Sequence, residues 1–199
     1  MKNFFKHLKI INSHRFKVMK FCIKAGIPIN GFKHDLSKYS KAEFVPSCKY
    51  YQGTSSPIVE ERTHNFGYSD ISIHHMNKNK HHYEYWIDAY KGKLLIKPMP
   101  FKYNLEYCLD MISASITYHK KDFKRSFVLE FFINREANYL MHPASKEFVI
   151  YCLNEYAQND FKNIKAKKLK PIYDDIVKKY GHTYFIETDY QKLKIKDGK

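Results

Sequence analysis

The sequence has no apolar run approaching the roughly 18 to 20 residues that a membrane-spanning helix needs. Its N-terminal stretch is basic and amphipathic, and it lacks the apolar core and small-residue cleavage site of a secretory signal. The four cysteines stand singly and form no Cys-x-x-Cys pair, which argues against a zinc ribbon and a disulfide framework. We therefore expect a cytoplasmic protein without a membrane partner.

Acidic residues are scarce relative to basic ones. The chain has 35 Lys and Arg against 20 Asp and Glu, a formal net charge of +15. Such an excess favours anionic partners, either a small phosphorylated substrate or nucleic acid. It is equally compatible with lysines that are simply solvated. The sequence shows no internal repeat, low-complexity segment, helix-turn-helix or RNA-recognition signature.

The hydrophobic pattern predicts an all-α, single-domain helical bundle over residues 1–184 and a basic tail over 185–199. At 199 residues with 44% hydrophobic content, the chain is long enough for one sizeable core. Ser40, His142 and either Ser69 or Asp70 are expected N-caps, and Gly26 and Gly181 are expected helix stops. Residues 27–32 and 53–68 are expected to be loops, and 94–96 a short extended segment. Apolar periodicity predicts helices over 2–25, 41–51, 71–76, 81–90, 102–119, 123–140, 143–153 and 164–180.

The segment His34-Asp35-Leu36-Ser37-Lys38 is the most informative stretch, because of the residues around it. His14 precedes it on the core-facing side of a predicted helix. Two histidine pairs, 74–75 and 81–82, follow it, and then Asp110. Neutral imidazoles and carboxylates are suitable ligands for a divalent transition metal such as Mn, Fe, Co, Ni or Zn. Asp35 can face one ion or bridge two.

This order of residues resembles the HD-domain superfamily of metal-dependent phosphohydrolases. The resemblance implies an HD-domain-like helical bundle with the metal in its centre. Carried over by position, it makes His14, His34, Asp35 and Asp110 ligands of a first ion, with His75 and His82 holding a second. The sequence leaves open whether one or two ions bind, and whether His74 or His81 replaces its neighbour. His64 is a further candidate.

The chain is also similar to an uncharacterised bacterial and phage family. The shared features are the His-Asp-Leu-Ser-Lys segment, the loop that begins at Tyr51, the stretch from His74 to Trp86, and Met99-Pro100. This similarity covers roughly residues 10 to 150 and implies no activity.

The function expected from the first resemblance is hydrolysis of a nucleotide or another small phosphate ester. Asp35 would hold metal, while Lys38 and Arg15 would offset charge on the phosphoryl oxygens. Arg15 can instead pair structurally with Glu43 or Asp35. Lys38, Lys78 and Lys80 are candidate substrate contacts.

Two other functions use the same features differently. A di-iron oxygenase on the same scaffold would use the same ligands. A non-enzymatic basic protein that binds nucleic acid or a nucleotide would leave the histidines structural. Tyr83 and Trp86 can stack on a base, although helical spacing favours core packing.

Overall fold

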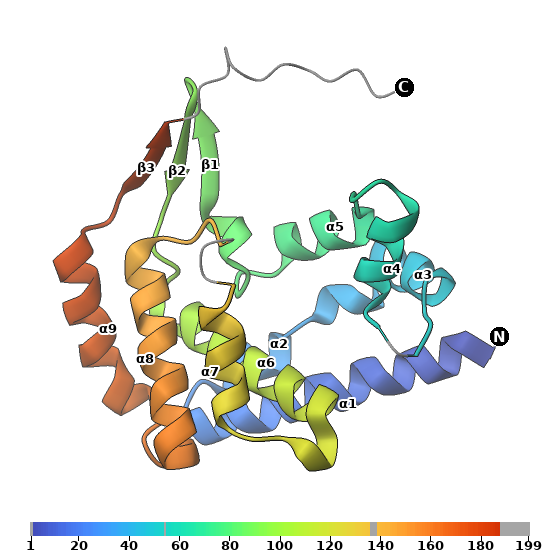
Figure 1. The fold of residues 1–199 in the computed structure, drawn as a ribbon, viewed down its shortest axis with the longest axis horizontal. Coiled ribbons are helices and arrows are strands. Elements are labelled where there is room, and N and C mark those ends of the chain that lie inside the picture. The colour runs from blue at the N-terminus through green and yellow to red at the C-terminus, as the bar shows by residue number, and fades with distance from the viewer. Residues whose placement is uncertain (1, 54, 136–138, 188–199) are drawn as a thin grey trace.

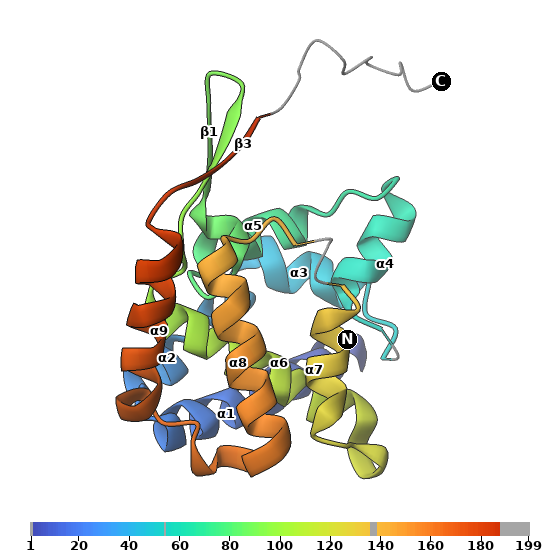
Figure 2. The same cartoon turned by 60° about the vertical axis from the view of Figure 1, so that its left-hand side comes forward.

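The computed structural model describes residues 2–53, 55–135 and 139–187. Helices make up most of this part of the chain, and a small three-stranded sheet projects from them (Figures 1 and 2). The prediction of a mainly helical protein is confirmed. The helices are α1 Lys2–Ala25, α2 Pro28–Lys33, α3 Lys41–Lys49, α4 Pro57–His64, α5 Asp70–Lys78, α6 Phe101–His119, α7 Ser126–Ile133, α8 Pro143–Asn159 and α9 Ala166–Tyr180.

Helix α6 is the central element of the bundle. It packs against α1, α2, α7, α8 and α9. Leu105, Leu109 and Ile112 recur on one face and are completely buried, as the predicted stripe over 102–119 requires. Burying a large aliphatic side chain stabilises a fold by about 1.5–3 kcal/mol. This core therefore fixes the other faces of α6 relative to the surrounding helices.

Local capping explains several helix boundaries. The Ser40 side chain accepts a hydrogen bond from the Glu43 amide, and Ser69 accepts one from the Ser72 amide. His142 Nδ1 accepts from the Ala144 amide at 3.1 Å. These three predicted N-caps are confirmed.

Two predicted loops contain helices. Pro28 begins α2 inside 27–32, and Pro57 begins α4 inside 53–68. In both, proline is favourable at the first helical position because its missing N–H has no intrahelical partner there. The sequence prediction assigned both segments wholly to loops, which was wrong. The α7 helix covers only part of predicted 123–140, of which 136–138 lie outside the described residues.

The predicted helix over 81–90 is also wrong. Here the chain forms a turn, a short 3-10 helix η2 (Tyr83–Trp86) and strand β1 (Ile87–Tyr90). A tight turn at Lys91-Gly92, both with positive φ, leads into β2 (Lys93–Ile96). Antiparallel pairing with β2 competes successfully with the helical pattern of the aromatic residues.

The predicted extended segment 94–96 is part of β2. Strand β2 also pairs with β3 (Tyr184–Glu187), which places Leu95 opposite Phe185. The order is β1-β2-β3, all antiparallel. Regular structure thus continues past the predicted boundary at 184, and the rest of the predicted tail lies outside the described residues.

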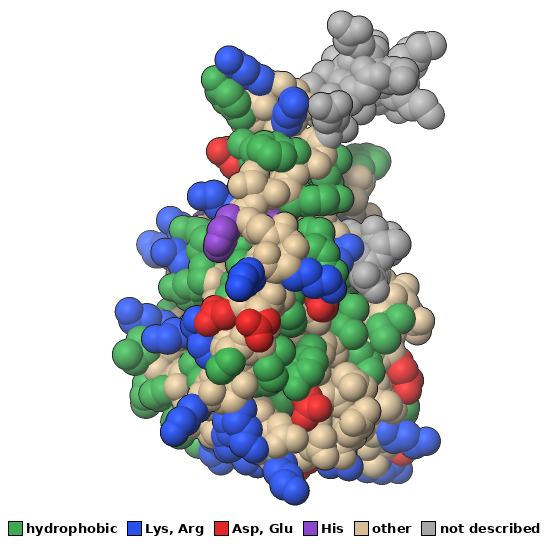
Figure 3. Space-filling view, turned by 90° about the vertical axis from the view of Figure 1, so that its left-hand side faces the viewer, with side chains coloured by type: hydrophobic (Ala, Val, Ile, Leu, Met, Phe, Trp, Pro, Cys, Tyr) green, Lys and Arg blue, Asp and Glu red, His purple; other side chains and the backbone are tan. Residues whose placement is uncertain are grey.

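Positive charge is dispersed over one face of the molecule. On the face seen in Figure 3, Lys and Arg side chains are spread from the base of the bundle to the tip of the sheet, with apolar side chains between them. Among the residues described, no helix combines the length and apolar character needed to cross a bilayer.

Gly31 marks the closest approach of α1 and α2. A Cβ atom built there would lie 2.7 Å from Cys22 Cβ and 3.0 Å from the Met19 Cα. Because one of these neighbours is helix backbone, a side chain can be accommodated only if the two helices move apart. Glycine at this position therefore sets the distance of α2, and of the residues that follow it, from α1.

We expect Gly31→Ala to lower the free energy of unfolding by about 1–3 kcal/mol, the usual cost of overpacking. In an exposed helix the same change would stabilise by up to about 1 kcal/mol. Urea denaturation of the variant and of the wild type measures the difference in their free energies of unfolding. Ile29→Ala, on the exposed side of the same helix, is the control and should change stability by less than about 0.5 kcal/mol. Stabilisation by Gly31→Ala would contradict the close contact.

Candidate metal centre

Side chains from α1, α5, α6 and two connecting turns converge at one buried cluster. Three groups of residues in this cluster could hold a metal ion. Within each group, the potential ligand atoms all lie within 4.8 Å of one another. The groups are Asp35 with His75, His81 and His82; His14 with His34 and Asp110; and His34 with His81 and Glu106.

Asp35 occupies the turn between α2 and the short 3-10 helix η1 (Leu36–Tyr39). Its backbone is left-handed, with φ 53° and ψ 27°, and its carbonyl accepts a hydrogen bond from the Lys38 amide at 3.1 Å. Aspartate is among the residues that tolerate this conformation. The turn lets two adjacent side chains enter the interior, because His34 and Asp35 are each only 1% exposed.

The Asp35 carboxylate has one oxygen on each side of the cluster. Its Oδ2 lies 3.3 Å from His34 Nε2 and 3.8 Å from His14 Nε2. His14 Nε2 is also 2.9 Å from Asp110 Oδ1. We call His14, His34 and Asp110 the outer subsite, since the side chains of His14 and Asp110 are 16% and 21% exposed.

The other oxygen, Asp35 Oδ1, lies 3.3 Å from His75 Nε2 and 3.4 Å from His81 Nε2. The ring of His82 is next to both, with centroid separations of 4.7 Å from His75 and 4.4 Å from His81. We call these three histidines the inner subsite. One buried carboxylate therefore connects two sets of possible ligands.

Several inward-facing atoms of the cluster have no hydrogen-bond partner among the residues that the structure describes. These are buried atoms with a lone pair or proton to share: His34 Nε2, Asp35 Oδ1, His81 Nε2 and His82 Nε2. Buried polar atoms are normally satisfied, because leaving one unpaired costs about 1–3 kcal/mol. Their convergence fits a cation at this place.

Glu106 on α6 orients two of the histidines. Its Oε1 lies 2.9 Å from His34 Nδ1 and 3.2 Å from His81 Nδ1, and its Oε2 accepts from Asn30 Nδ2 at 2.9 Å. Burial alone would raise the pKa of Glu106, but the hydrogen bonds from both imidazoles lower it. With the Nδ1 protons directed at this carboxylate, both Nε2 lone pairs face the centre.

Glu43 on α3 orients two histidines of α5 in the same way. Its Oε2 lies 2.8 Å from His75 Nδ1, and its Oε1 lies 2.8 Å from His74 Nδ1. Burial would raise the pKa of Glu43, but its bonds to His75, Ser37 and His74 lower it. His75 is thereby turned toward Asp35, whereas His74 is held outside the cluster.

Lys38 is the cation nearest the centre. Its Nζ lies 2.6 Å from Asp35 Oδ2, and its side chain is 30% exposed. Burial opposes charge on both groups, but His34 and Lys38 hold the pKa of Asp35 well below its usual value. The carboxylates of Asp35 and Asp110 raise the pKa of Lys38. This pair is therefore charged.

Burial acts to lower the pKa of each of these imidazoles, but the net shifts differ in direction. Burial lowers the pKa of His34 and, together with the neighbouring His81 and His75, lowers that of His82 well below its usual value. Burial also acts to lower the pKa of His81, but its bond to Glu106 and the charge of Asp35 raise it overall. Burial opposes charge on Asp110 too, yet its contact with His14 holds its pKa far below normal.

The structure brings all six sequence-predicted ligands together, namely His14, His34, Asp35, His75, His82 and Asp110. It also shows which member of each histidine pair lies at the cluster. His75, not His74, faces the centre, and His81 and His82 both do. They can do so because this segment is a turn and not the predicted helix, which would place consecutive side chains about 100° apart.

Other predicted residues lie elsewhere. His64 is exposed, with Nδ1 2.8 Å from the Glu60 carbonyl. Lys78 is exposed, and Lys80 lies over the ring of Tyr85. Tyr83 and Trp86 pack against Tyr139 and Tyr103 of the protein, as the core interpretation expects.

Arg15 contacts neither Glu43 nor Asp35 through a described hydrogen bond or ion pair. It donates to the backbone carbonyls of His34 and Phe32, at 2.7 and 3.1 Å, and to the Tyr39 hydroxyl. The guanidinium therefore secures the turn that presents His34 and Asp35.

Sequence reasoning missed the two orienting carboxylates. Glu106 lies one helical turn before Asp110, so the two share a face of α6, and that spacing was the available signal. From the sequence, Glu43 was considered as a capping partner of Ser40 and as a possible ion-pair partner of Arg15, and not as a contact of the histidines. Its amide does bond Ser40, but its carboxylate is used on the histidines.

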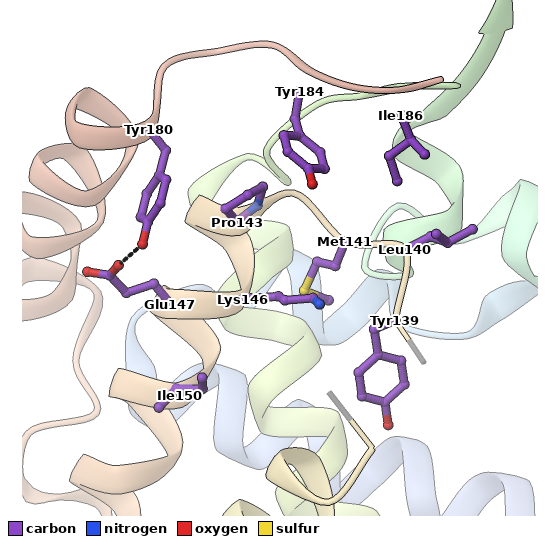
Figure 4. A pocket seen from close by; sticks show the side chains of 10 residues that line it. All are labelled: Tyr139, Leu140, Met141, Pro143, Lys146, Glu147, Ile150, Tyr180, Tyr184 and Ile186. Carbon is purple, nitrogen blue, oxygen red and sulfur yellow. Dashed lines mark hydrogen bonds between the residues drawn. The ribbon is translucent and has the colours of Figure 1, made fainter. Parts of the chain in front are cut away.

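A separate cavity of about 430 Å³ lies between α8, α9 and β3 (Figure 4). Tyr139, Tyr180, Tyr184 and Glu147 are among its lining residues, and Glu147 is bonded to the Tyr180 hydroxyl. None of the cluster residues lines this cavity. The cavity and the histidine cluster are therefore separate features of the chain.

Comparison with known proteins gives a family and no activity. Residues 3–155 match DUF5662, a family of unknown function. No curated protein and no solved structure matches the chain. The match spans far more than half of the 199 residues and includes every residue of the cluster. The chain belongs to DUF5662, a family of unknown function.

Proposed function

We propose that this protein is a metal-dependent phosphohydrolase that acts on a nucleotide or another small phosphate ester. The observation that carries the proposal is the position of Asp35 between two sets of imidazole and carboxylate ligands, with a charged lysine beside it. A carboxylate shared by two ligand sets suits a pair of ions acting on one phosphoryl group.

The donor set fits divalent transition metals. Five imidazoles and two carboxylates form the two subsites, a combination that suits Mn, Fe, Co, Ni or Zn better than Mg or Ca. His14, His34, Asp35 and Asp110 would hold one ion, and Asp35, His75, His81 and His82 the other. Such ions supply an activated water and withdraw electron density from phosphoryl oxygens.

The chain's own residues would bind and orient the substrate. Lys38 is charged and partly exposed beside Asp35, so its ammonium can bind a phosphoryl oxygen. The exposed edge of the cluster lies at His14 and Asp110, which makes the outer subsite the side that substrate reaches. Glu106, Glu43 and Arg15 would act as positioning residues, because each contacts a ligand residue and not the open edge.

A di-iron oxygenase is the second candidate, because the same nitrogen-rich donor set also suits iron. The residue that separates the candidates is Lys38. A cation fixed at the edge of the centre is useful for an anionic phosphate ester. On the face seen in Figure 3, the Lys and Arg side chains are spread out, which gives less support to a third candidate, nucleic-acid binding through one basic patch.

We expect purified wild-type protein to contain up to two transition-metal ions per chain by elemental analysis, and Asp35→Asn to lose at least one of them. Asn preserves the left-handed backbone of Asp35, whereas Ala would be strained there. Asp174→Asn, at an exposed position on α9, is the matched control. A wild-type protein that neither contains metal nor binds added Mn²⁺, Co²⁺ or Ni²⁺ would sink the proposal. Salt-sensitive nucleic-acid binding that survives loss of His34 and Asp35 would then favour the third candidate.

Glu106→Gln tests the orienting role of this side chain. The amide's NH₂ group would oppose either Asn30 or an imidazole N–H, so His34 and His81 would lose their fixed orientation. We expect metal affinity to fall about 10- to 100-fold, as is usual for such outer partners. Equilibrium competition with a metal-sensitive dye measures it. Glu147→Gln, on α8 away from the cluster, should leave affinity unchanged, and equal losses in both variants would refute a specific role.

Metal-loaded protein should release p-nitrophenol from p-nitrophenyl phosphate or from the corresponding diester. Asp35→Asn should abolish the activity, and Lys38→Met should lower kcat about 10²- to 10³-fold if Lys38 stabilises developing charge. Activity that persists in Asp35→Asn would exclude this site as its source. Absence of hydrolysis, combined with oxygen consumption by the iron-loaded protein, would favour the oxygenase.

A further inference from the structure

The two oxygens of Asp35 are held differently. Oδ2 accepts a charged hydrogen bond from Lys38 Nζ at 2.6 Å. Oδ1 is buried and makes no hydrogen bond among the described residues. A cation that approaches Oδ1 therefore meets a free acceptor, whereas a cation that approaches Oδ2 must first displace an ammonium.

The subsites differ in the same direction. Among the described residues, His81 Nε2 and His82 Nε2 of the inner subsite have no hydrogen-bond partner, and neither has His34 Nε2 of the outer subsite. The difference lies at the edge of the outer subsite, where His14 Nε2 is 2.9 Å from Asp110 Oδ1. In the inner subsite, His75 Nε2 is 3.3 Å from Asp35 Oδ1. An ion that enters the outer subsite must therefore break a closer contact between two of its possible ligands.

We propose that the two subsites fill in a fixed order, inner before outer, and that Lys38 holds the place of the outer ion until that ion binds. This inference rests on the proposed function, because both subsites must bind metal. Once the outer ion is in place, Lys38 leaves Asp35 and turns to the anionic substrate. The same side chain thus neutralises the centre before it is fully loaded and binds phosphate afterwards.

The surroundings of Lys38 support such a movement. Its backbone is fixed, because its amide is bonded to the Asp35 carbonyl. Its side chain is long and 30% exposed, so Nζ can move without unfolding η1. The ammonium of Lys38 lies beside Asp35 Oδ2, where it repels an incoming cation. By linkage, a phosphate that engages Lys38 should favour the outer ion.

The order can be tested by calorimetric titration of metal-free, full-length protein with Mn²⁺. We expect one tight and one weaker binding event in the wild type. Asp110→Asn should remove the weaker event and leave the tight one, whereas His82→Ala should remove the tight one. Loss of the tight event in Asp110→Asn would overturn the proposed order of binding. This variant leaves Lys38 itself unchanged.

The role of Lys38 is tested by Lys38→Met beside Lys38→Arg. Met keeps the length of the side chain without its charge, so the weaker event should tighten about tenfold or more while the tight event stays the same. Arg keeps the charge and should leave both nearly unchanged. An unchanged or weaker second event in correctly folded Lys38→Met, as judged by circular dichroism, would overturn the inference.

The effect of inorganic phosphate on Mn²⁺ binding can be measured in the wild type, so this test does not require Lys38→Met to fold. Added to the wild type, phosphate should tighten the second Mn²⁺ event and leave the first unchanged. If Lys38→Met does fold, this coupling should be smaller in it. Phosphate that has no effect on the second event would count against Lys38 moving between metal site and substrate. Wild-type protein that binds no Mn²⁺ would overturn the proposed function itself, whereas two events without order overturn only this inference.

Discussion

The buried Asp35 carboxylate is the constraint on which the rest of the site depends. A charge that is 1% exposed is strongly disfavoured unless opposite charges and hydrogen bonds compensate it. Lys38 compensates one oxygen, and His75 and His81 lie near the other. The left-handed turn, the Arg15 contacts to the His34 and Phe32 carbonyls, and the close packing of Gly31 on α1 all hold this carboxylate in place.

The helical core connects stability to the site through α6. The apolar face of this helix is completely buried at Leu105, Leu109 and Ile112. This packing fixes the rotation of the helix about its axis and its position along that axis. Glu106 and Asp110 then project toward the cluster from the same helix. Glu106 contacts one imidazole from each subsite, which makes a single residue of α6 responsible for orienting ligands on both sides of Asp35.

Most of the fold and most of the cluster could be predicted from local patterns. Apolar periodicity located α1 and α6, and the order of His and Asp residues identified the six expected ligands. What failed depended on tertiary contacts. Pairing with β2 overrode the helical pattern of 81–90, and only the resulting turn brings His81 inward beside His82. The role of Glu43 was hidden because its capping position is a sufficient local explanation, and its carboxylate meets His75 only in the folded chain.

Charge balance within the centre connects the metal proposal to the class of substrate. Asp35, Asp110, Glu43 and Glu106 are four carboxylates, and the pKa of each is lowered. Lys38 supplies one compensating ammonium, so with neutral imidazoles the centre carries three more negative charges than positive ones. Two divalent cations would reverse the sign and leave one excess positive charge at the partly exposed edge formed by His14 and Asp110. A loaded centre of this kind would attract an anion and release Lys38 to bind it, which is the electrostatic reason for preferring a phosphate ester over a neutral substrate.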